Sequence, residues 1–175
     1  TATGGILSAP LTTTRPTDAV TALPAGFVKK GYVGEDGVTK TIDKTDEKIK
    51  AWGGSTVKIV RQEHSVSYSW TFLESGNAEV LKAIYGADNV IITPATVDHG
   101  AQIEVRETGQ MLPRESWLME MKDGGTAIRE YVPDGQLAVS GDVQFVHSNV
   151  ISYTVTLEAF PDANGLQDFV AVEPA

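Results

Sequence analysis

The chain has 175 residues, with 14 Lys or Arg, 23 Asp or Glu and no Cys, which gives a formal net charge of −9. The lack of Cys excludes disulfides, thiolate catalysis and Cys-ligated zinc, and the acidic charge disfavours a protein that grips the phosphates of nucleic acid. Hydrophobic residues make up 41% of the chain, enough for the core of one domain. No apolar run reaches the roughly 18 residues that a membrane-spanning helix needs.

The first 24 residues are rich in Thr, Ala, Gly and Pro and follow no hydrophobic period. This composition predicts an extended N-terminal arm over residues 1–24, followed by a single β-domain over residues 25–175. The arm contains small apolar stretches, and we expect its side chains Ile6, Leu7 and Leu11 to lie along a partner.

Three segments lead up to the middle of the chain. Short strands are predicted at Phe27–Gly34 and Val38–Ile42, joined as a hairpin through Asp36-Gly37, because Asp-Gly between extended runs favours a tight turn. The charged segment Asp43–Gly54 is compatible with a helical turn that its closing glycine pair ends. A further strand is expected at Thr56–Gln62.

The clearest periodicity lies between Ser65 and Gly86. Apolar residues occupy every second position from Val66 to Phe72 and alternate with Ser and Thr, which predicts a long strand, Ser65–Glu74, that is buried on one face. The spacing then becomes helical over Val80–Tyr85, and Gly86 marks the stop. A helix this short is unstable alone in water, so we expect it to dock on the apolar face of the strand.

The remaining chain is predicted to form strands separated by turns rich in Gly, Pro and Asp. The strands are Asn89–Thr93, Ala101–Glu107, Ser116–Lys122, Thr126–Val132, Leu137–His147, Val150–Ala159 and Leu166–Val172. Turns are predicted at Asp123-Gly124-Gly125 and at Pro133-Asp134-Gly135. The absence of βαβ alternation favours a mainly β fold, an antiparallel two-sheet sandwich or flattened barrel with one short flanking α-helix.

The second face of the long strands carries small hydroxyl side chains instead of the Lys and Glu that usually cover a solvent face. These residues are Ser65, Ser67, Ser69 and Thr71 in one strand and Ser152, Thr154 and Thr156 in another. Two interpretations stay open. The rows form an ordinary polar outer face, or they form a smooth, neutral surface past which something moves without sticking.

A search for catalytic and ligand-binding motifs finds little. The sequence lacks a nucleotide-binding glycine motif, a P-loop, a zinc-protease motif and a Gly-x-Ser-x-Gly elbow. Asp98-His99 has no second pair to complete a metal site. The acidic loop 162–168 has the wrong ligand spacing for calcium. We therefore predict no catalytic residue, no metal and no cofactor.

Trp52 differs from the other two tryptophans because it lies in a glycine-flanked loop. It is either an anchor tucked under the sheet or an aromatic placed for a partner subunit, since Trp is enriched at the centres of interfaces. Trp70 and Trp117 lie on alternating faces of strands and are predicted to be core residues.

Several stretches in the first half of the chain carry a family resemblance. They are Ser8–Leu11, Pro16–Leu23, Gly31–Val38 (GYVGEDGV), Asp43, Thr45, Glu47–Gly54 (EKIKAWGG), Glu74-Ser75, Asn77-Ala78, Val80–Lys82 and Tyr85-Gly86. With them the chain resembles the major tail tube proteins of long, flexible-tailed bacteriophages, especially those that infect actinobacteria. The similarity covers most of Ser8–Asn89 and, beyond it, the order of strands.

The resemblance implies a non-enzymatic structural protein of the virion tail that is assembled in the host cytoplasm. In the family, subunits form hexameric rings that stack into a tube, strands join into one barrel around a lumen, and the genome leaves through it. Termini and a long loop reach neighbouring subunits. The implied partners are other copies of the chain, the tape measure, tail terminator and distal tail proteins, and DNA in transient passage, with no membrane.

Two sets of site residues follow from the resemblance together with the residue pattern. Lumen-facing candidates are Ser65, Ser67, Ser69, Thr71, Asp142, Gln144, Ser152, Thr154, Thr156 and Glu158. Candidates for contacts between subunits are Ile6, Leu7, Leu11, Lys48, Ile49, Trp52, Gly53 and Gly54. An anionic wall suits the passage of DNA, because duplex DNA carries about one negative charge per 1.7 Å of its axis.

Other functions remain open at this point. A β-sandwich module that binds carbohydrate would present several coplanar exposed aromatics, whereas aromatic residues make up only 7% of this chain. A hydrolytic enzyme would need a convergent polar pocket, which no motif marks. A tail terminator or head decoration protein would form a single ring instead of a stack.

Overall fold

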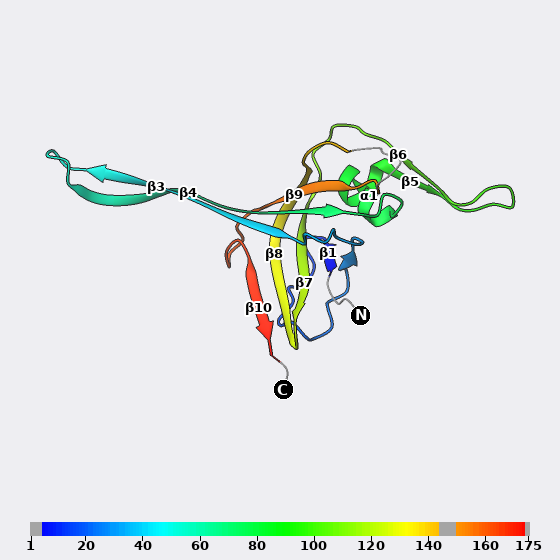
Figure 1. The fold of residues 1–175 in the computed structure, drawn as a ribbon, viewed down its shortest axis with the longest axis horizontal. Helices are drawn as coiled ribbons and strands as arrows, with labels where there is room; N and C mark the ends of the chain where they lie inside the picture. Colours follow the sequence, from blue (N-terminus) through cyan, green and yellow to red (C-terminus); the bar gives the residue numbers. More distant parts are fainter. Residues whose placement is uncertain (1–4, 144–149, 174–175) are drawn as a thin grey trace.

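The computed structural model describes residues 5–143 and 150–173. Figure 1 shows a β-rich body from which two hairpins project on opposite sides. The strands are β1 Gly5–Ala9, β2 Val28–Lys29, β3 Thr39–Lys50, β4 Thr56–Phe72, β5 Val90–Thr93, β6 Gln102–Val105, β7 Arg114–Asp123, β8 Thr126–Val139, β9 Tyr153–Ala159 and β10 Asp168–Val172. Helix α1 spans Ala78–Tyr85, and the short 3-10 helix η1 spans Ala87–Asn89.

Two antiparallel sheets make up the fold. Eight strands form one sheet in the order β2-β1-β7-β8-β9-β4-β3, with β10 paired to β8, and β5 and β6 form the second. The prediction of a mainly β, antiparallel protein with one short helix is confirmed. The eight-stranded sheet does not close into a barrel. Within the described residues, the outer sides of β2 and β3 have no strand partner, so these borders carry backbone groups that another strand could pair.

The long alternating strand and the helix after it are confirmed. Val66, Tyr68, Trp70 and Phe72 point into the core, and none is more than 3% exposed. Asn77 caps α1 by accepting the Glu79 N–H at 2.9 Å, and Gly86 ends the helix with φ 90°. The buried face of α1 belongs to the same apolar cluster as Trp70 and Phe72, so the helix docks on the strand as expected. The strand itself is longer than predicted because Thr56–Gln62 continues into it as β4.

Two predictions for the segment before β4 are wrong. The Asp36-Gly37 turn exists, with the Gly37 N–H donating to the Gly34 carbonyl at 3.0 Å, but the flanking strands do not pair with each other. β2 pairs with β1, and β3 pairs with β4. The predicted helical turn within Asp43–Gly54 is also wrong. Residues up to Lys50 form β3, because β4 offers a backbone partner along the whole segment and this pairing overrides a weak local preference.

The predicted turn at Pro133-Asp134-Gly135 is wrong as well. β8 runs through these residues and stays paired with β7 on both sides of them, whereas on its other side β10 pairs up to Tyr131 and β9 from Gly135 onward. The register with β7 shifts at this place, which is typical of a bulge. Gly135 is required by packing, since a Cβ atom would lie 2.8 Å from Leu157 Cδ1. The Pro-Asp-Gly sequence therefore marks a bend within a strand.

The N-terminal segment is partly built into the body. β1 lies between β2 and β7, so Ile6 and Leu7 are 1% and 3% exposed and fill the subunit's own core. A contact between them and a neighbour would require β1 to leave the sheet. Farther along, the Arg129 guanidinium donates to the carbonyl oxygens of Asp18 and Thr21. The division into an arm of residues 1–24 and a domain of residues 25–175 stays a prediction.

Candidate functional site

The small hydroxyl side chains form one continuous surface, which we call the hydroxyl face. β4 pairs with β3 on one side and β9 on the other, so that Thr39, Ser69 and Thr156 lie in one row, and Ser67 lies between Thr41 and Glu158 in the next. The Thr71 and Thr154 hydroxyls share a hydrogen bond of 3.2 Å, and the Thr156 hydroxyl donates to Ser140 at 3.1 Å. The face consists of Thr39, Thr41, Ser65, Ser67, Ser69, Thr71, Ser140, Thr154 and Thr156.

The charged side chains within this face are acidic. Asp43, opposite Ser65, and Glu158, opposite Ser67, are the acidic members of its rows. Lys40 lies on the other side of the sheet, where its Nζ contacts the Glu130 carboxylate at 2.7 Å. No side chain on this face in the described rows from Thr39–Asp43 to Gln136–Ser140 is basic, and the row of Glu158 and Gln136 continues to Arg114 of β7, which is paired with Asp134.

A buried polar cluster fixes the sheet beneath the hydroxyl face. Glu130 is 4% exposed and accepts the Tyr68 hydroxyl at 2.6 Å as well as pairing with Lys40. Burial, followed by the hydrogen bond to the Glu130 carboxylate, raises the pKa of Tyr68 well above its ordinary value. The cluster links β3, β4 and β8, so the three strands keep their relative positions.

The predicted lumen residues are only partly brought together. Ser65, Ser67, Ser69, Thr71, Thr154, Thr156 and Glu158 share the paired rows. Ser152 precedes β9 and is half-buried, and Asp142 is exposed in the loop after β8. Gln144 lies outside the described residues. Sequence reasoning missed Thr39, Thr41 and Ser140, although the Thr39-x-Thr41 alternation was a signal that could have found the first two.

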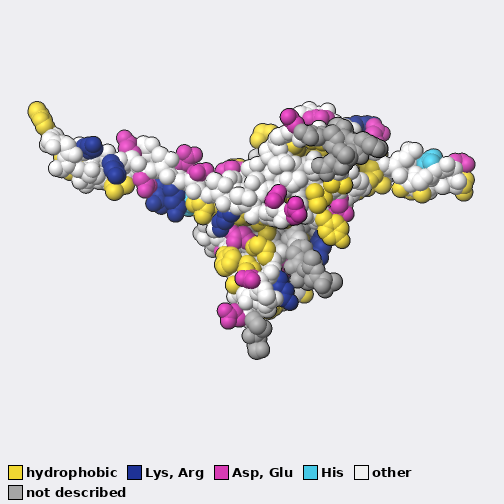
Figure 2. All heavy atoms as spheres, viewed as in Figure 1, with side chains coloured by type: hydrophobic (Ala, Val, Ile, Leu, Met, Phe, Trp, Pro, Cys, Tyr) yellow, Lys and Arg dark blue, Asp and Glu magenta, His cyan; other side chains and the backbone are white. Residues whose placement is uncertain are grey.

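The β3–β4 hairpin is the second candidate surface. All of β3 is exposed, and β4 is exposed or half-exposed until Ser65. Figure 2 shows dark-blue Lys and Arg side chains along this hairpin and a hydrophobic side chain at its far tip. The segment Thr39–Phe72 holds six basic and four acidic residues, although acidic residues outnumber basic ones in the whole chain. The hairpin is thus a basic projection from an acidic body.

The tip of the hairpin leaves Trp52 without cover. The Ala51 N–H donates to the Ser55 carbonyl at 2.8 Å, and Gly53 and Gly54 turn the chain at φ 110° and 89°. Trp52 is fully exposed, at 107% of the reference value. Its interpretation as an anchor under the sheet is therefore wrong for this subunit, whereas Trp70 and Trp117 are confirmed as core residues.

The other candidates for contacts between subunits lie at exposed positions. Ile49 and Lys48 belong to the outer part of β3, and Leu11 follows β1 with about half of its surface exposed. Gly53 and Gly54 have no other atoms within 4 Å of an added Cβ, so the turn stands clear of the body. The single chain does not test any of these contacts, which stay predictions.

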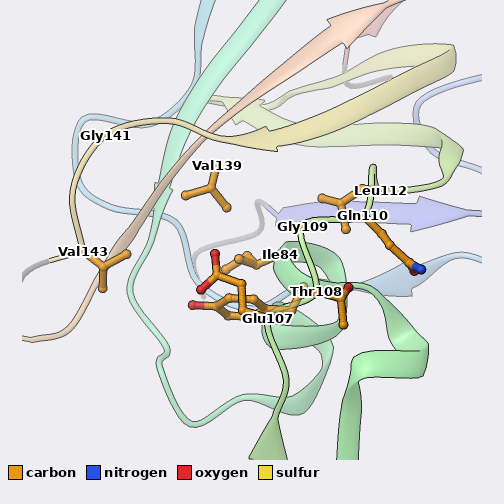
Figure 3. A pocket seen from close by; sticks show the side chains of 10 residues that line it. Ile84, Glu107, Thr108, Gly109, Gln110, Leu112, Val139, Gly141 and Val143 are labelled. Carbon is orange, nitrogen blue, oxygen red and sulfur yellow. The ribbon is translucent and has the colours of Figure 1, made fainter.

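Two hollows adjoin the end of β8 beside α1. Each has a volume of about 380 Å³, and they share Ile84, Gln110, Leu112 and Val139. Figure 3 shows the first, with the Glu107 carboxylate between Ile84 and Val139, whose side chains point into the space. Burial, followed by Tyr153 and Glu107, raises the pKa of Tyr85 in its wall. The second hollow is more apolar and includes Met111, Leu137 and Phe160.

Neither a metal centre nor a membrane span is found in the parts of the chain that the structure describes. Over residues 5–143 and 150–173, Asp, Glu and His side chains do not gather into a group of three or more that could hold a metal ion. In the same ranges, no helix has the length and apolar character needed to cross a bilayer.

An open antiparallel sheet with a smooth polar face and projecting hairpins defines a β-rich structural subunit with surfaces suited to assembly. A family model described as phage tail tube protein matches residues 1–171. The chain therefore belongs to the phage tail tube protein family, which confirms the resemblance and places the chain in the virion tail together with other tail proteins. A comparison with curated proteins finds no match.

Proposed function

We propose that copies of this chain form hexameric rings, that the rings stack into the tail tube, and that the hydroxyl face lines the lumen through which the DNA genome leaves. The observation that carries the proposal is the paired rows of hydroxyls that extend across β3, β4, β9 and the end of β8. A wall of this kind lets a polyanion slide past, because it offers no cation to hold the phosphates.

The charge of the chain supports the same role. A formal charge of −9 per subunit gives an assembled ring a strongly negative potential, which keeps DNA away from the wall. The basic residues of the β3–β4 hairpin stand away from the hydroxyl face and are available for protein contacts. Tape measure, tail terminator and distal tail proteins are the partners that we propose for the ends and the interior of the tube.

The open sheet supports ring formation. β3 lies at one end of the eight-stranded sheet and β2 at the other, and β10 pairs along one side of β8. An unpaired strand edge is a hazard for a monomer, but it is satisfied when neighbouring subunits close a ring. We propose that these edges join neighbouring subunits into one continuous sheet around the lumen.

Electron microscopy tests the proposal. Purified protein at high concentration should form rings or tubes of constant diameter, and a reconstruction should place Ser67, Ser69 and Thr156 on the inner wall. A protein that remains monomeric at every concentration and is absent from virions contradicts the proposal. A tube with the hydroxyl face outside contradicts the lumen assignment alone.

A further inference from the structure

The exposed tip of the β3–β4 hairpin and the apolar hollow beside α1 are complementary features of the same molecule. We propose that Trp52 of one subunit inserts into the hollow between α1 and the end of β8 of a second copy. This inference rests on the proposed assembly and adds to it the site at which the tip docks. We call the hollow lined by Ile84, Met111, Leu112, Val139 and Phe160 the α1 groove.

The tip has a side chain that needs a partner. Trp52 is fully exposed, and the glycines after it leave open space around the turn. The outer strands add apolar side chains that are also exposed, namely Ile49, Val57 and Ile59. A large aromatic side chain that is displayed in this way is typical of an interface anchor, because an aromatic side chain buries about 150–250 Å² when it is covered.

The α1 groove has the size and the lining for such an anchor. Its volume of about 380 Å³ lies within the range of roughly 300–1,000 Å³ that is usual for sites enclosing a ring-bearing group. The lining is mostly apolar, and two of its side chains, Met111 at 82% and Val139 at 42% exposed, lack cover within the subunit. Met is well suited to receive an aromatic ring, since its thioether adapts to the shape of the partner.

The charges on the two surfaces are opposite. The tip segment from Lys48 to Lys58 contains three Lys residues and no carboxylate. The groove is lined by Glu158, and Glu107 lines the hollow next to it. The nearby Arg114 lies over the Phe160 ring and is paired with Asp134, so its charge is already compensated. Lysines of the tip would therefore meet the Glu107 carboxylate beside the groove, on the side away from the hydroxyl face.

The geometry favours a second copy over the same chain. Figure 1 shows the β3–β4 hairpin extending from the body on the side opposite α1. Nine residue steps separate Asp43 from Trp52, which corresponds to a reach of roughly 30 Å for an extended chain. A subunit cannot place this tip in its own groove. Tip and groove are different surfaces, so the contact is heterologous and repeats from subunit to subunit, as rings and filaments require.

Thiol cross-linking tests the docking site, because the chain has no Cys of its own. Ala51→Cys places a thiol beside Trp52, and Met111→Cys places one at the groove. In assembled protein, a short bismaleimide should link this pair into a ladder of covalent oligomers on a denaturing gel. The matched control combines Ala51→Cys with Val97→Cys, which is fully exposed at the tip of the other hairpin and should give no ladder.

The possible outcomes separate this inference from the proposed function. If tubes form but the Ala51→Cys/Val97→Cys variant cross-links, or neither variant cross-links, the docking site is wrong. The proposed role in the tail tube is not affected by that result. Wild-type protein that never forms rings or tubes overturns both. If the Cys variants fail to assemble, acrylamide quenching of the tryptophan fluorescence of the wild-type protein tests the docking of Trp52 instead. One of the three tryptophans should be accessible in the free subunit and none in the tube, and persistent quenching in the tube refutes insertion of Trp52.

Discussion

The hydroxyl oxygens of Thr71 and Thr154 lie 3.2 Å apart across the β4–β9 pair, although 83 positions separate the two residues in the chain. This contact joins two rows of small side chains into one surface. The neighbouring pairs Ser69–Thr156 and Ser67–Glu158 extend it along both strands. A smooth polar wall is therefore a product of strand register, and a cation placed on either row should disturb the same surface.

The double variant Ser69→Lys with Thr156→Lys tests this wall. The two residues face each other, so the variant adds two neighbouring cations per subunit. Under the proposed function, assembled tubes should retain duplex DNA at low salt, and the retention should fall steeply as salt rises, because phosphate binding releases counterions. Cosedimentation of DNA with tubes measures the effect. Gln102→Lys, on an exposed strand away from the face, is the control, and equal DNA retention by this variant would contradict the lumen assignment.

The buried Glu130 cluster predicts a graded loss of stability. Tyr68→Phe removes the hydroxyl that contacts Glu130 at 2.6 Å and Gln167 at 2.5 Å and should lower the free energy of unfolding by about 1 kcal/mol. Glu130→Leu leaves Lys40 without its ion-pair partner, whereas the Tyr68 hydroxyl keeps Gln167, and the variant should cost about 2–3 kcal/mol, since Lys40 keeps some access to water. Urea denaturation of each variant gives the values. Glu35→Leu, at an exposed position, should change little, and an equally large loss there would argue against the cluster.

Gly135 should not tolerate even one methyl group. In Gly135→Ala the new Cβ would lie 2.8 Å from Leu157 Cδ1 and 3.2 Å from Trp117 Cδ1, so the core must shift. We expect a loss of about 1–3 kcal/mol in the free energy of unfolding, the usual cost of overpacking. Gly76→Ala is the matched control, because nothing lies within 4 Å of its added Cβ. Thermal denaturation of both variants compares them, and equal midpoints would refute the packing role of Gly135.

The loop at Asp18 predicts a pH dependence in the acid range. Hydrogen bonds from the Thr21 side chain, and then from the backbone N–H groups of Thr21 and Val20, lower the pKa of Asp18 from 3.8 to about 2. The folded pKa lies below the unfolded one, so the carboxylate stabilises the loop above pH 3.8, and this contribution is lost as the pH falls through about 2. Amide chemical shifts of Val20 and Thr21 should report a midpoint near 2.

The matched variant for this titration is Asp18→Asn, which keeps an oxygen acceptor but has no proton to gain. Its Val20 and Thr21 amide shifts should stay constant over the same acid range. A wild-type midpoint at the ordinary value of 3.8 would show that the hydrogen bonds of the loop do not hold the carboxylate ionised.

Local periodicity predicted the elements whose environment is set by their own residues. The alternation from Val66 to Phe72 and the spacing of Val80–Tyr85 gave a strand and a helix, and both are found. Strand pairing could not be predicted in the same way, because it joins distant residues. Pro133-Asp134-Gly135 has the composition of a turn, yet the pairing of β8 with β7 and β9 keeps it extended.

The candidate site was predictable to a similar extent. The small hydroxyls of β4 and β9 could be seen in the sequence, but their union into one face depends on a register that alternation alone does not define. Trp52 could be singled out in the sequence because glycines follow it, whereas its distance from the body depends on the length of β3 and β4. The α1 groove was missed, since its walls come from α1, the segment before β7 and the ends of β8 and β9.

β4 continues for 17 residues from the tip of the hairpin to Phe72 as one strand, and each of the two register shifts against β3 leaves one β4 residue, Val57 and Gln62, without a partner on β3. A pull on the tip is therefore carried along a single backbone into Trp70 and Phe72, and from there across the ladder to β9 and β8. Because a bulge bends the strand that carries it, the hairpin can also bend at these two places. When a long tail bends, the outer hairpin would take up part of the strain, and the unbroken pairing beyond Glu63 would pass the rest into the sheet.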